Sequence, residues 1–527
     1  EKLEQVITTY QQIIQKTELE LQNARKRIYY ISLLRLILFV GAVANAIIFW
    51  SDGWLCLSAF AVLPFILFIW LVKRHNYRKD FLKKKIEINE QELRAMQYDF
   101  SDFDDGKEFI NPSHLYTLDL DVFGEHSLFQ YINRTATPIG KQHLANWFNA
   151  HLENKEAIDH RQEAIRELST DLEYRQQIRL LGLLYKGKPA DTTEIKEWAA
   201  SPSYYRKRTL LRILPIAVTV INFLCISLAI LGIISANIAG GVFVSFVLFS
   251  TIFSKGITKL QTTYGEKLQV LSTYADQILL TEQKEMHSHI LQELKADLTS
   301  QNQTASQAVR QLSKLMNALD QRSNLLMSTI LNGLIFWELR QVMRIEKWKE
   351  IHASDLPRWI ETIGEIDAYC SLATFAYNHP DYIYPTIAAQ SFHLQAEALG
   401  HPLMDRNQCV RNGIDIEKRP FFIIITGANM AGKSTYLRTV GVNYLLACIG
   451  APVWAKQMKI YPARLVTSLR TSDSLANNES YFFAELKRLK LIIDKLEAGE
   501  ELFIILDEIL KGTNSMDKQK GSFALIK

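Results

Sequence analysis

The sequence has few cysteines, prolines and glycines for its length. Five cysteines are scattered among 527 residues without a C-x-x-C pair, so neither a disulfide framework nor a thiolate zinc site is indicated. Only 13 prolines and 23 glycines occur, so a collagen-like or wholly disordered chain is also excluded. The net charge is only +4, so the charge of the whole chain does not by itself indicate nucleic-acid binding. The composition predicts several folded domains, and the cysteines fit a reducing compartment.

Long apolar runs are the first positive feature. Residues 31–50 and 54–72 are apolar and are separated only by Ser51-Asp52-Gly53, and residues 213–234 and 238–253 repeat this plan around a second short turn. About 20 helical residues span the ~30 Å hydrocarbon layer of a bilayer. Basic residues flank the outer ends of both pairs, as is typical of the cytoplasmic side: Arg25, Lys26, Arg27, Lys73, Arg74, Arg78, Lys79, Arg206, Lys207, Arg208, Arg212, Lys255 and Lys259. The pattern predicts two transmembrane hairpins with cytoplasmic ends; the alternative is a set of buried helices in a large soluble protein.

The other segments are predicted to be soluble and mostly helical, with an α/β region at the end. We expect a multidomain protein in which transmembrane helical hairpins join an all-α core and lever domain and a C-terminal α/β domain. The expected parts are an amphipathic juxtamembrane helix at 1–30, hairpin 1 at 31–72, a basic helix and linker at 73–112, a helical core at 113–209, hairpin 2 at 210–254, a helical lever at 255–385 and the α/β domain at 386–527.

The motif that carries the chemistry begins near residue 421. Residues 421–426 (FFIIIT) have the composition of a buried strand and run into GANMAGKST, after which residues 436–447 are predicted to be helical. This is the pattern G-x-x-x-x-G-K-[ST] between a strand and a helix. Main-chain N–H groups and the helix N-terminus would hold phosphate oxygens, Lys433 would reach the β- and γ-phosphates, and Ser434 would offer its hydroxyl to Mg²⁺. The motif predicts an ATP site.

A second predicted strand, residues 501–506, ends in Asp507-Glu508. An aspartate at the end of such a strand can hold the Mg²⁺ shell, and the adjacent glutamate can orient or deprotonate the attacking water. Between the two motifs, polar residues lead at Ser480 into an apolar-periodic helix. Ser480 is predicted to cap this helix, and in a dimer the same helix end could reach the γ-phosphate held by the other subunit. The pair of motifs predicts hydrolysis of ATP and not only its binding.

Three motifs together resemble the ATPase domain of the MutS DNA mismatch repair family, whose fold is similar to that of ABC-type ATPases. They are TGANMAGKST at 426–435, SYFFAEL at 480–486 and DEILKGTN at 507–514. Further upstream, FGEHSLFQ at 123–130 and NRTATPIGK at 133–141 resemble the start of that family's helical core domain. The resemblance covers roughly residues 115–200 and 256–527. It implies that residues 113–209 form a MutS-like helical core and that residues 386–527 form an α/β P-loop ATPase domain of ABC type.

The resemblance implies a role for individual residues. Glu508 and Lys433 would be catalytic, Ser434 and Asp507 would bind Mg²⁺, and Ser480 would bind the nucleotide of the partner subunit. The residues that would bind ATP within one subunit are Gly427, Ala428, Asn429, Met430, Ala431, Gly432, Lys433, Ser434 and Thr435. The family's N-terminal mismatch-reading domain is not visible, and a membrane hairpin stands where it should be, so the DNA-contacting residues stay unassigned.

The favoured interpretation is a membrane-anchored MutS-like ATPase that binds mismatched or branched double-stranded DNA in an ATP-dependent way. It would use ATP and Mg²⁺, dimerise through its ATPase domains and lie in a membrane, by analogy the bacterial inner membrane, with the ATPase domain in the cytoplasm. One alternative is a half-transporter of ABC type, although the transporter signature with its paired glycines is missing. Another is a membrane scaffold that ATP regulates without DNA binding. Stimulation of ATP hydrolysis by DNA would separate the first interpretation from the scaffold.

Overall fold

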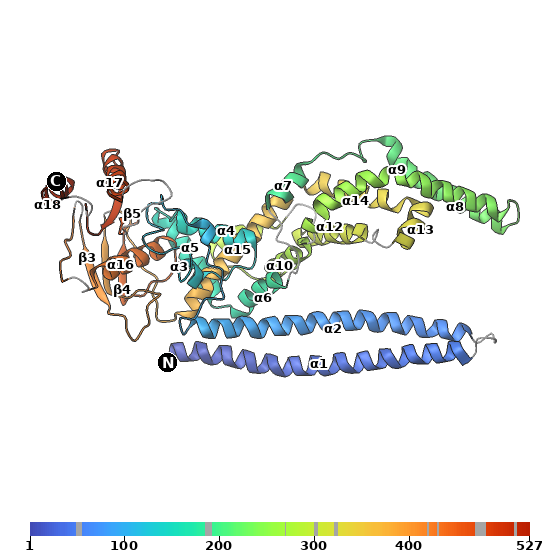
Figure 1. Cartoon of the computed structure of the whole chain (residues 1–527), viewed down its shortest axis with the longest axis horizontal. Helices are drawn as coiled ribbons and strands as arrows, with labels where there is room; N and C mark the ends of the chain where they lie inside the picture. The colour runs from blue at the N-terminus through green and yellow to red at the C-terminus, as the bar shows by residue number, and fades with distance from the viewer. Residues whose placement is uncertain are drawn as a thin grey trace. The chain divides into compact units, whose positions relative to one another are not determined.

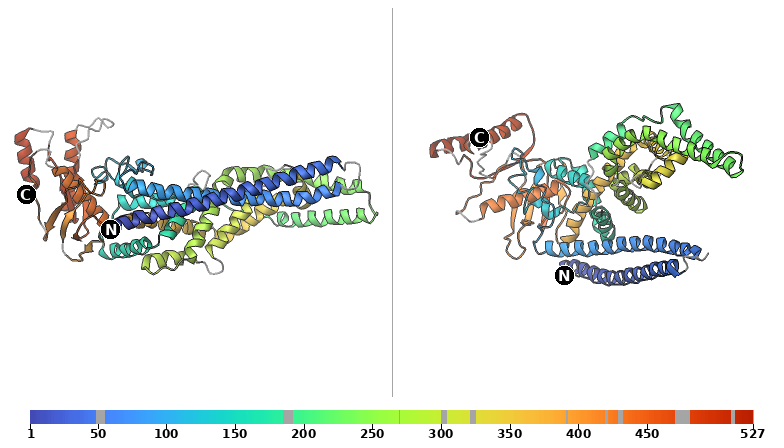
Figure 2. Two further views of the ribbon diagram at one scale, coloured as in Figure 1. Left: turned by 90° about the horizontal axis from the view of Figure 1, so that it is seen from below. Right: turned by 45° about the vertical axis from the view of Figure 1, so that its right-hand side comes forward.

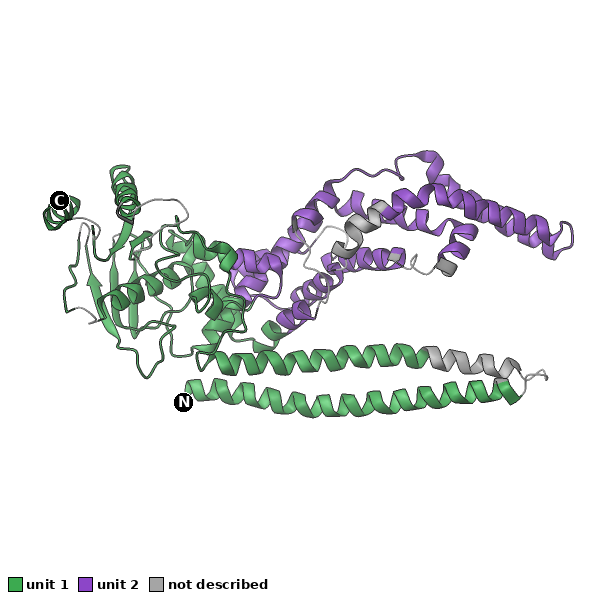
Figure 3. Cartoon of the chain, viewed as in Figure 1, with its two compact units in different colours: residues 1–134, 145–176, 371–527 green, residues 135–144, 177–370 purple. Residues whose placement is uncertain are grey.

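The computed structural model describes residues 1–48, 55–184, 192–268, 270–299, 304–320, 325–390, 392–418, 421–428, 432–469, 481–510 and 514–526. The chain forms two compact units, which are green and purple in Figure 3. Unit 1 comprises residues 1–134, 145–176 and 371–527, and unit 2 comprises residues 135–144 and 177–370. The chain passes between the units at Arg134–Thr135 and then within α4 (Pro138–Asn149), α6 (Leu172–Leu183) and α15 (Asp355–Asn378).

Unit 1 begins with two long helices, α1 (Lys2–Ile48) and α2 (Leu55–Ala95), which lie antiparallel and side by side in Figures 1 and 2. Leu21, Ala24 and Leu82 form a small buried cluster between them. Further along α1 the large apolar and aromatic side chains are exposed: Tyr29, Tyr30, Leu33, Leu34, Leu36, Ile37, Phe39, Val40, Val43, Ile47 and Ile48. Soluble proteins rarely expose a contiguous apolar stretch of this length.

A buried polar network joins these two helices to the end of α15. The Tyr10 hydroxyl donates to Asn378 Oδ1 at 2.7 Å, and Asn378 Nδ2 donates to Glu92 Oε2 at 2.8 Å. Arg134 Nε donates to the other oxygen, Glu92 Oε1, also at 2.7 Å. The side chains of Arg134 and Glu92 are only 5% and 3% exposed. Because buried charges are tolerated only when they are paired and hydrogen-bonded, this network fixes how α1 and α2 join the rest of unit 1.

Two sheets make up the α/β part of unit 1. One has the strand order β1-β4-β2-β3, with β1 (Thr386–Ile387) parallel to β4 (Gln457–Ile460), and β2 (Leu394–Leu399) antiparallel to both β4 and β3 (Asn412–Ile416). The other pairs β5 (Arg464–Ser468) with β6 (Leu502–Leu506) in parallel, with α17 (Tyr481–Glu497) between them in the chain. Helix α16 (Lys433–Cys448) is buried from Thr439 to its end. The remaining elements of unit 1 are η1 (Lys107–Phe109), α3 (Leu128–Ile132), α5 (Lys155–Ser169) and α18 (Ser515–Ile526).

The strand predicted over residues 421–426 is not present. Residues 421–428 have no regular secondary structure and pair with neither sheet, and Phe421, Phe422, Ile423 and Ile424 are 48%, 62%, 44% and 67% exposed. The prediction of a buried strand at this position was therefore wrong for this structure. An apolar run becomes a buried strand only where neighbouring strands accept its hydrogen bonds, and such pairing is not encoded in the run itself. The predicted helix after the loop and the predicted strand before Asp507 are both confirmed, as α16 and β6.

Unit 2 is helical in its described part, and its hairpin is built from α8 (Thr209–Ile230) and α9 (Ala236–Leu268). Asn222 of α8 donates from Nδ2 to the carbonyls of Gly333 and Leu334 at 2.9 and 3.1 Å, which close the end of α13 (Leu325–Ile335). Arg340 Nη2 donates to Pro215 O at 2.7 Å and to Thr219 Oγ1 at 2.6 Å. The other helices are α7 (Thr192–Ala200), α10 (Leu271–Gln283), α11 (His289–Asp297), α12 (Ala305–Asp320) and α14 (Trp337–His352).

Among the described residues, three helical stretches are long and apolar enough to cross a membrane: Lys2–Asn45, Thr209–Ile230 and Ala236–Thr258. This finding rests on length and composition. They correspond to three of the four predicted crossings. The fourth, residues 54–72, falls largely on positions whose placement or side chains lie outside the described residues.

Candidate functional site

The predicted phosphate loop meets helix α16 at Gly432. This glycine has φ of 86° and precedes Lys433, the first residue of the helix. A side chain is strained in such a left-handed conformation, which explains the glycine, and a Cβ added here would meet no atom within 4 Å. Lys433 Nζ donates to the carbonyl of Gly427 at 2.7 Å, so the lysine bridges the two ends of the loop. Asn429, Met430 and Ala431 lie outside the described residues.

The acidic pair lies at the end of β6. Because β5 and β6 are parallel and in register up to Ser468 and Leu506, both strands end at the same edge. The Asp507 N–H continues the pairing by donating to Ser468 O at 3.0 Å. Glu508 follows with φ of 47°, an uncommon conformation for a residue other than glycine. Such outliers persist where the surrounding structure holds them, and they are frequent at functional sites.

The structure brings the two motifs together at Ser434 and Asp507. The Ser434 hydroxyl donates to Asp507 Oδ2 at 2.5 Å, although 73 positions separate these residues in the chain. Thr435 lies beside Ser434 in the first turn of α16, and both are exposed. A hydroxyl and a carboxylate at this distance, next to a helix N-terminus and a lysine, are suited to a cation and to phosphate oxygens.

This donor set fits Mg²⁺ in particular. Mg²⁺ prefers hard oxygen ligands and usually takes only one or two carboxylates from the protein, with water and substrate phosphates in the remaining positions. In the described part of the chain, no cluster of three or more His, Cys, Asp or Glu side chains could hold a metal ion. A metal at this edge would therefore depend on Ser434, Asp507 and oxygens from a bound substrate.

Ser480, predicted to act on the nucleotide of a partner subunit, lies outside the described residues. Helix α17 begins directly after it, at Tyr481. Asn514 lies after the acidic pair and caps α18, because its Oδ1 accepts from the Asp517 N–H at 2.9 Å.

Sequence reasoning missed Glu485, which connects α17 to the segment after the acidic pair. Its side chain is 6% exposed, and Oε1 accepts a hydrogen bond from the Leu510 N–H at 2.5 Å. The Leu510 backbone is itself left-handed, with φ of 57°. Glu485 thus holds the turn that carries Glu508. Glu485 belongs to the SYFFAEL motif, and the only sign of its role in the sequence is a charged residue on the apolar face of a predicted helix.

A buried aspartate supports the same edge from the N-terminal side of unit 1. Asp119 Oδ2 accepts from Thr467 Oγ1 at 2.6 Å and from the Leu469 N–H at 3.1 Å, at the end of β5. His401 is half-buried, and Asp121 and Arg438 act on it electrostatically; partial burial lowers its pKa to about 4. His401 is therefore neutral at pH 7.

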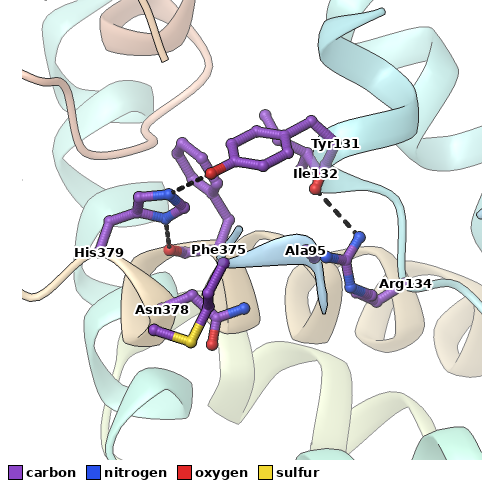
Figure 4. Close-up of a pocket in the computed structure, with 8 residues that line it drawn as sticks. Ala95, Tyr131, Ile132, Arg134, Phe375, Asn378 and His379 are labelled. Carbon is purple, nitrogen blue, oxygen red and sulfur yellow. Dashed lines mark hydrogen bonds between the residues drawn. The ribbon is translucent and has the colours of Figure 1, made fainter. Parts of the chain in front are cut away.

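A small cavity elsewhere in unit 1 is not a substrate site. Figure 4 shows it between Tyr131, Arg134, Phe375 and His379, and its volume is about 10 Å³. That volume holds no more than about one water molecule. Tyr131 and His379 are joined there by a hydrogen bond of 2.8 Å, and the second ring nitrogen of His379 contacts Phe375 O at 2.7 Å. These groups form a structural core and leave the edge at Ser434 and Asp507 as the candidate site.

In the described residues, a lysine and a hydroxyl at the N-terminus of α16 thus lie beside a carboxylate at the end of β6. Two family models match the chain: MutS domain III over residues 114–373 and MutS domain V over residues 423–527. The chain belongs to the MutS family.

Several curated relatives carry the name DNA mismatch repair protein MutS. The protein from Haloquadratum walsbyi is 37% identical over 161 residues, which are 30% of this chain and 16% of that protein. The protein from Thermotoga petrophila is 34% identical over 185 residues, 34% of this chain and 22% of that protein. The protein from Thermus thermophilus is 33% identical over 186 residues, 35% of this chain and 21% of that protein. The matched part of the chain thus spans about a fifth of the length of these relatives.

Proposed function

We propose that this chain is a membrane-anchored MutS-family ATPase, in which hydrolysis of ATP is coupled to binding of mismatched or branched double-stranded DNA. The observation that carries the ATPase part is the hydrogen bond of 2.5 Å between Ser434 and Asp507. It places the loop hydroxyl and the strand-end carboxylate at one point, as a nucleotide with Mg²⁺ requires.

Each residue of the loop has a task that its chemistry suits. The main-chain N–H groups from Gly427 to Thr435, with Ala428, Asn429, Met430, Ala431 and Gly432 between them, would donate to phosphate oxygens. The Lys433 ammonium would move from the Gly427 carbonyl to the β- and γ-phosphates, where its charge is better compensated. Ser434 and Asp507 would hold Mg²⁺, which when bound neutralises charge on the β- and γ-phosphate oxygens.

Glu508 is the residue proposed to act on water. It follows Asp507 in an exposed turn that Glu485 fixes through Leu510, so its carboxylate can be presented to the same edge. There it would orient the attacking water and accept its proton. Ser480, just before α17, is proposed to reach the nucleotide of a second subunit, which makes a homodimer through these domains the expected assembly.

Membrane anchoring is proposed from the surface of the long helices. The apolar part of α1 is exposed, as are Ile213, Ile216, Phe223 and Leu224 of α8. Soluble proteins rarely expose contiguous apolar surface of this extent. Basic residues flank these stretches, which favours a multi-pass protein with the ATPase domain in the cytoplasm, by analogy at a bacterial inner membrane.

The proposal is tested with the full chain in detergent or nanodiscs. ATP hydrolysis is measured without DNA and with homoduplex, mismatched and four-way DNA at stated salt, because affinity for the DNA backbone falls steeply with ionic strength. We expect hydrolysis that mismatched or branched DNA stimulates. Hydrolysis that no DNA changes would instead favour an ATP-regulated membrane scaffold.

Two variants test the site. Lys433→Ala should lose nucleotide binding, whereas Glu508→Gln should retain binding of a fluorescent ATP analogue and lose nearly all turnover. The matched controls are Lys490→Ala and Glu497→Gln, which change exposed residues of α17. Retained turnover in Glu508→Gln would show that another group positions the water. Unchanged nucleotide affinity in Lys433→Ala would refute the phosphate-loop assignment.

A further inference from the structure

A cleft opens between α1 and α2 of unit 1, next to the apolar part of the two helices. Its volume is about 500 Å³, within the range of small-molecule sites. Asn23 and Arg27 of α1 line it from one side, and Arg74, His75 and Arg78 of α2 line it from the other.

The cleft is strongly basic. Glu20 is the acidic residue in its wall, and it is paired with Arg78 at 3.0 Å. Within the described part of the chain, neither Arg27 nor Arg74 has a carboxylate partner, and Arg74 instead lies over the Trp70 ring at 5.7 Å. Two guanidinium groups that line one cleft, in which Glu20 is paired with Arg78, predict an anionic ligand. Arginine also presents a planar set of donors that matches phosphate oxygens.

The position of the cleft along the helices indicates where that anion comes from. Tyr29 and Tyr30 are each 65% exposed and Trp70 is 54% exposed, and beyond them the exposed side chains of α1 are apolar. Exposed aromatic rings beside an apolar stretch are typical of the membrane–water boundary. At 1.5 Å per residue, Arg27 and Arg74 lie only about 5 Å along their helices from these rings, on the side away from the apolar stretch. This is the depth of lipid headgroups, which form a layer roughly 5 to 8 Å thick on each side of the hydrocarbon.

We propose that this cleft is a binding site for the phosphate of an anionic phospholipid headgroup. Arg27 and Arg74 donate to the phosphate oxygens, and Asn23 and His75 supply further polar contacts. The inference rests on the proposed membrane anchoring of α1 and α2, and it adds a defined lipid site to it. A general attraction of basic residues to an anionic surface would not require a cleft, whereas a cleft of about 500 Å³ is large enough for one headgroup.

The test uses two preparations of the full chain. One is reconstituted in nanodiscs, and the other is kept in detergent and titrated with phosphatidylglycerol or phosphatidylcholine. Binding is followed by native mass spectrometry and by quenching of tryptophan fluorescence with brominated lipid, since Trp70 lies beside Arg74. We expect wild-type protein to retain phosphatidylglycerol in preference to phosphatidylcholine. The double variant Arg27→Gln/Arg74→Gln should bind phosphatidylglycerol at least about tenfold more weakly. The matched control, Arg25→Gln/Lys26→Gln, also removes two positive charges, from exposed residues of α1 that precede Arg27 and do not line the cleft. It should keep the preference.

Further arms separate the other sources of phosphate. Glycerol phosphate that competes as well as the lipid would show a site for soluble phosphate compounds, and duplex DNA that displaces the lipid would show a nucleic-acid site; either result overturns the proposal. Equal loss in the double variant and its control would reduce the effect to general surface charge and would also overturn it. Membrane anchoring is scored separately by retention in membranes after a carbonate wash. Protein that stays in the membrane but shows no lipid preference refutes the lipid site alone, and protein that washes off refutes both.

Discussion

Replacing Glu92 by glutamine should destabilise unit 1 severely. The substitution preserves the shape of the side chain but removes the negative charge that Arg134 faces in the interior, where both side chains are almost inaccessible to water. Breaking a buried ion pair by removing one partner costs about 3 to 5 kcal/mol, because the remaining charge is left uncompensated. Arg134 retains hydrogen bonds of 3.0 Å to the carbonyls of Tyr131 and Asn133, and its guanidinium lies 3.5 Å from the centre of the Phe103 ring. We therefore expect the lower end of the range, about 3 kcal/mol.

The assay is thermal unfolding of the full chain in detergent, followed by tryptophan fluorescence. Because a chain with two units does not unfold in a single two-state step, midpoints of the same transition are compared between variants. A loss of this size should lower the midpoint by roughly 5 °C. The control is Asp159→Asn, which breaks the pair with Lys155 at 2.5 Å, where the side chains are 43% and 37% exposed. Such a pair contributes only about 0.5 kcal/mol.

The double variant Glu92→Met/Arg134→Met provides the decisive comparison. Apolar replacement of a whole buried pair is often neutral, so the double variant should be less destabilised than Glu92→Gln alone. A midpoint shift in Glu92→Gln no larger than that of Asp159→Asn would refute the argument. The argument would also be refuted if the double variant lost at least as much stability as Glu92→Met and Arg134→Met lose together. The loss of stability would then come from lost packing and not from an unpaired charge.

Three further predictions concern pH, the candidate site and the second hairpin. Burial lowers the pKa of His379 to about 4, below the ~6.5 of a histidine in an unfolded chain, so the stability that the neutral ring contributes is complete above pH 6.5 and is lost as the pH falls toward 4. At pH 5 the loss is about 2 kcal/mol, so the thermal midpoint should be lower at pH 5 than at pH 7. An equal difference between the two midpoints in His379→Gln would contradict this prediction. Glu485→Ala removes the acceptor of the Leu510 N–H and should lower kcat while nucleotide affinity changes less than about threefold. The control Glu497→Ala, at the exposed end of the same helix, should change neither quantity. If Glu485→Ala weakens nucleotide affinity by as large a factor as it lowers kcat, Glu485 belongs to the binding site instead. Asn222→Leu removes two hydrogen bonds to the end of α13 and should lower the free energy of unfolding by about 1 kcal/mol, as judged from thermal unfolding. The control Ser227→Ala should lower it less, because that hydroxyl donates only to a carbonyl of its own helix. Equal losses in the two variants would show that α13 does not depend on Asn222.

Features specified by local sequence were predictable. The helix after the phosphate loop, the strand before Asp507 and the apolar helices of the second hairpin all appear where periodicity and composition placed them. Each of them depends on hydrogen bonds and side-chain spacing within a short segment, which the sequence displays directly. The strand expected at 421–426 failed for the opposite reason, because a strand needs partners that a short window cannot reveal.

The same distinction explains why buried polar residues were missed. Glu485 acts through Leu510, which lies 25 positions away, and Glu92 acts through Arg134, 42 positions away. A charged residue in a helix is normally solvated, so sequence alone favours an exposed position for both. Only the fold identifies the partner that makes burial tolerable. By contrast, Ser434 and Asp507 could be paired in advance because each belongs to a motif whose chemistry requires the other.

The proposed nucleotide site and the proposed membrane hairpins are divided between the two units. Unit 1 contains the α1–α2 hairpin together with the candidate nucleotide site, while unit 2 contains the α8–α9 hairpin. If both hairpins cross the membrane, a change that nucleotide causes within unit 1 can reach the lipid through α1 and α2 without involving unit 2. A movement of one unit against the other would instead have to shift one hairpin relative to the other in the bilayer. Lipids that restrict such movement should therefore slow only the steps that need both units, and leave nucleotide binding by unit 1 unchanged.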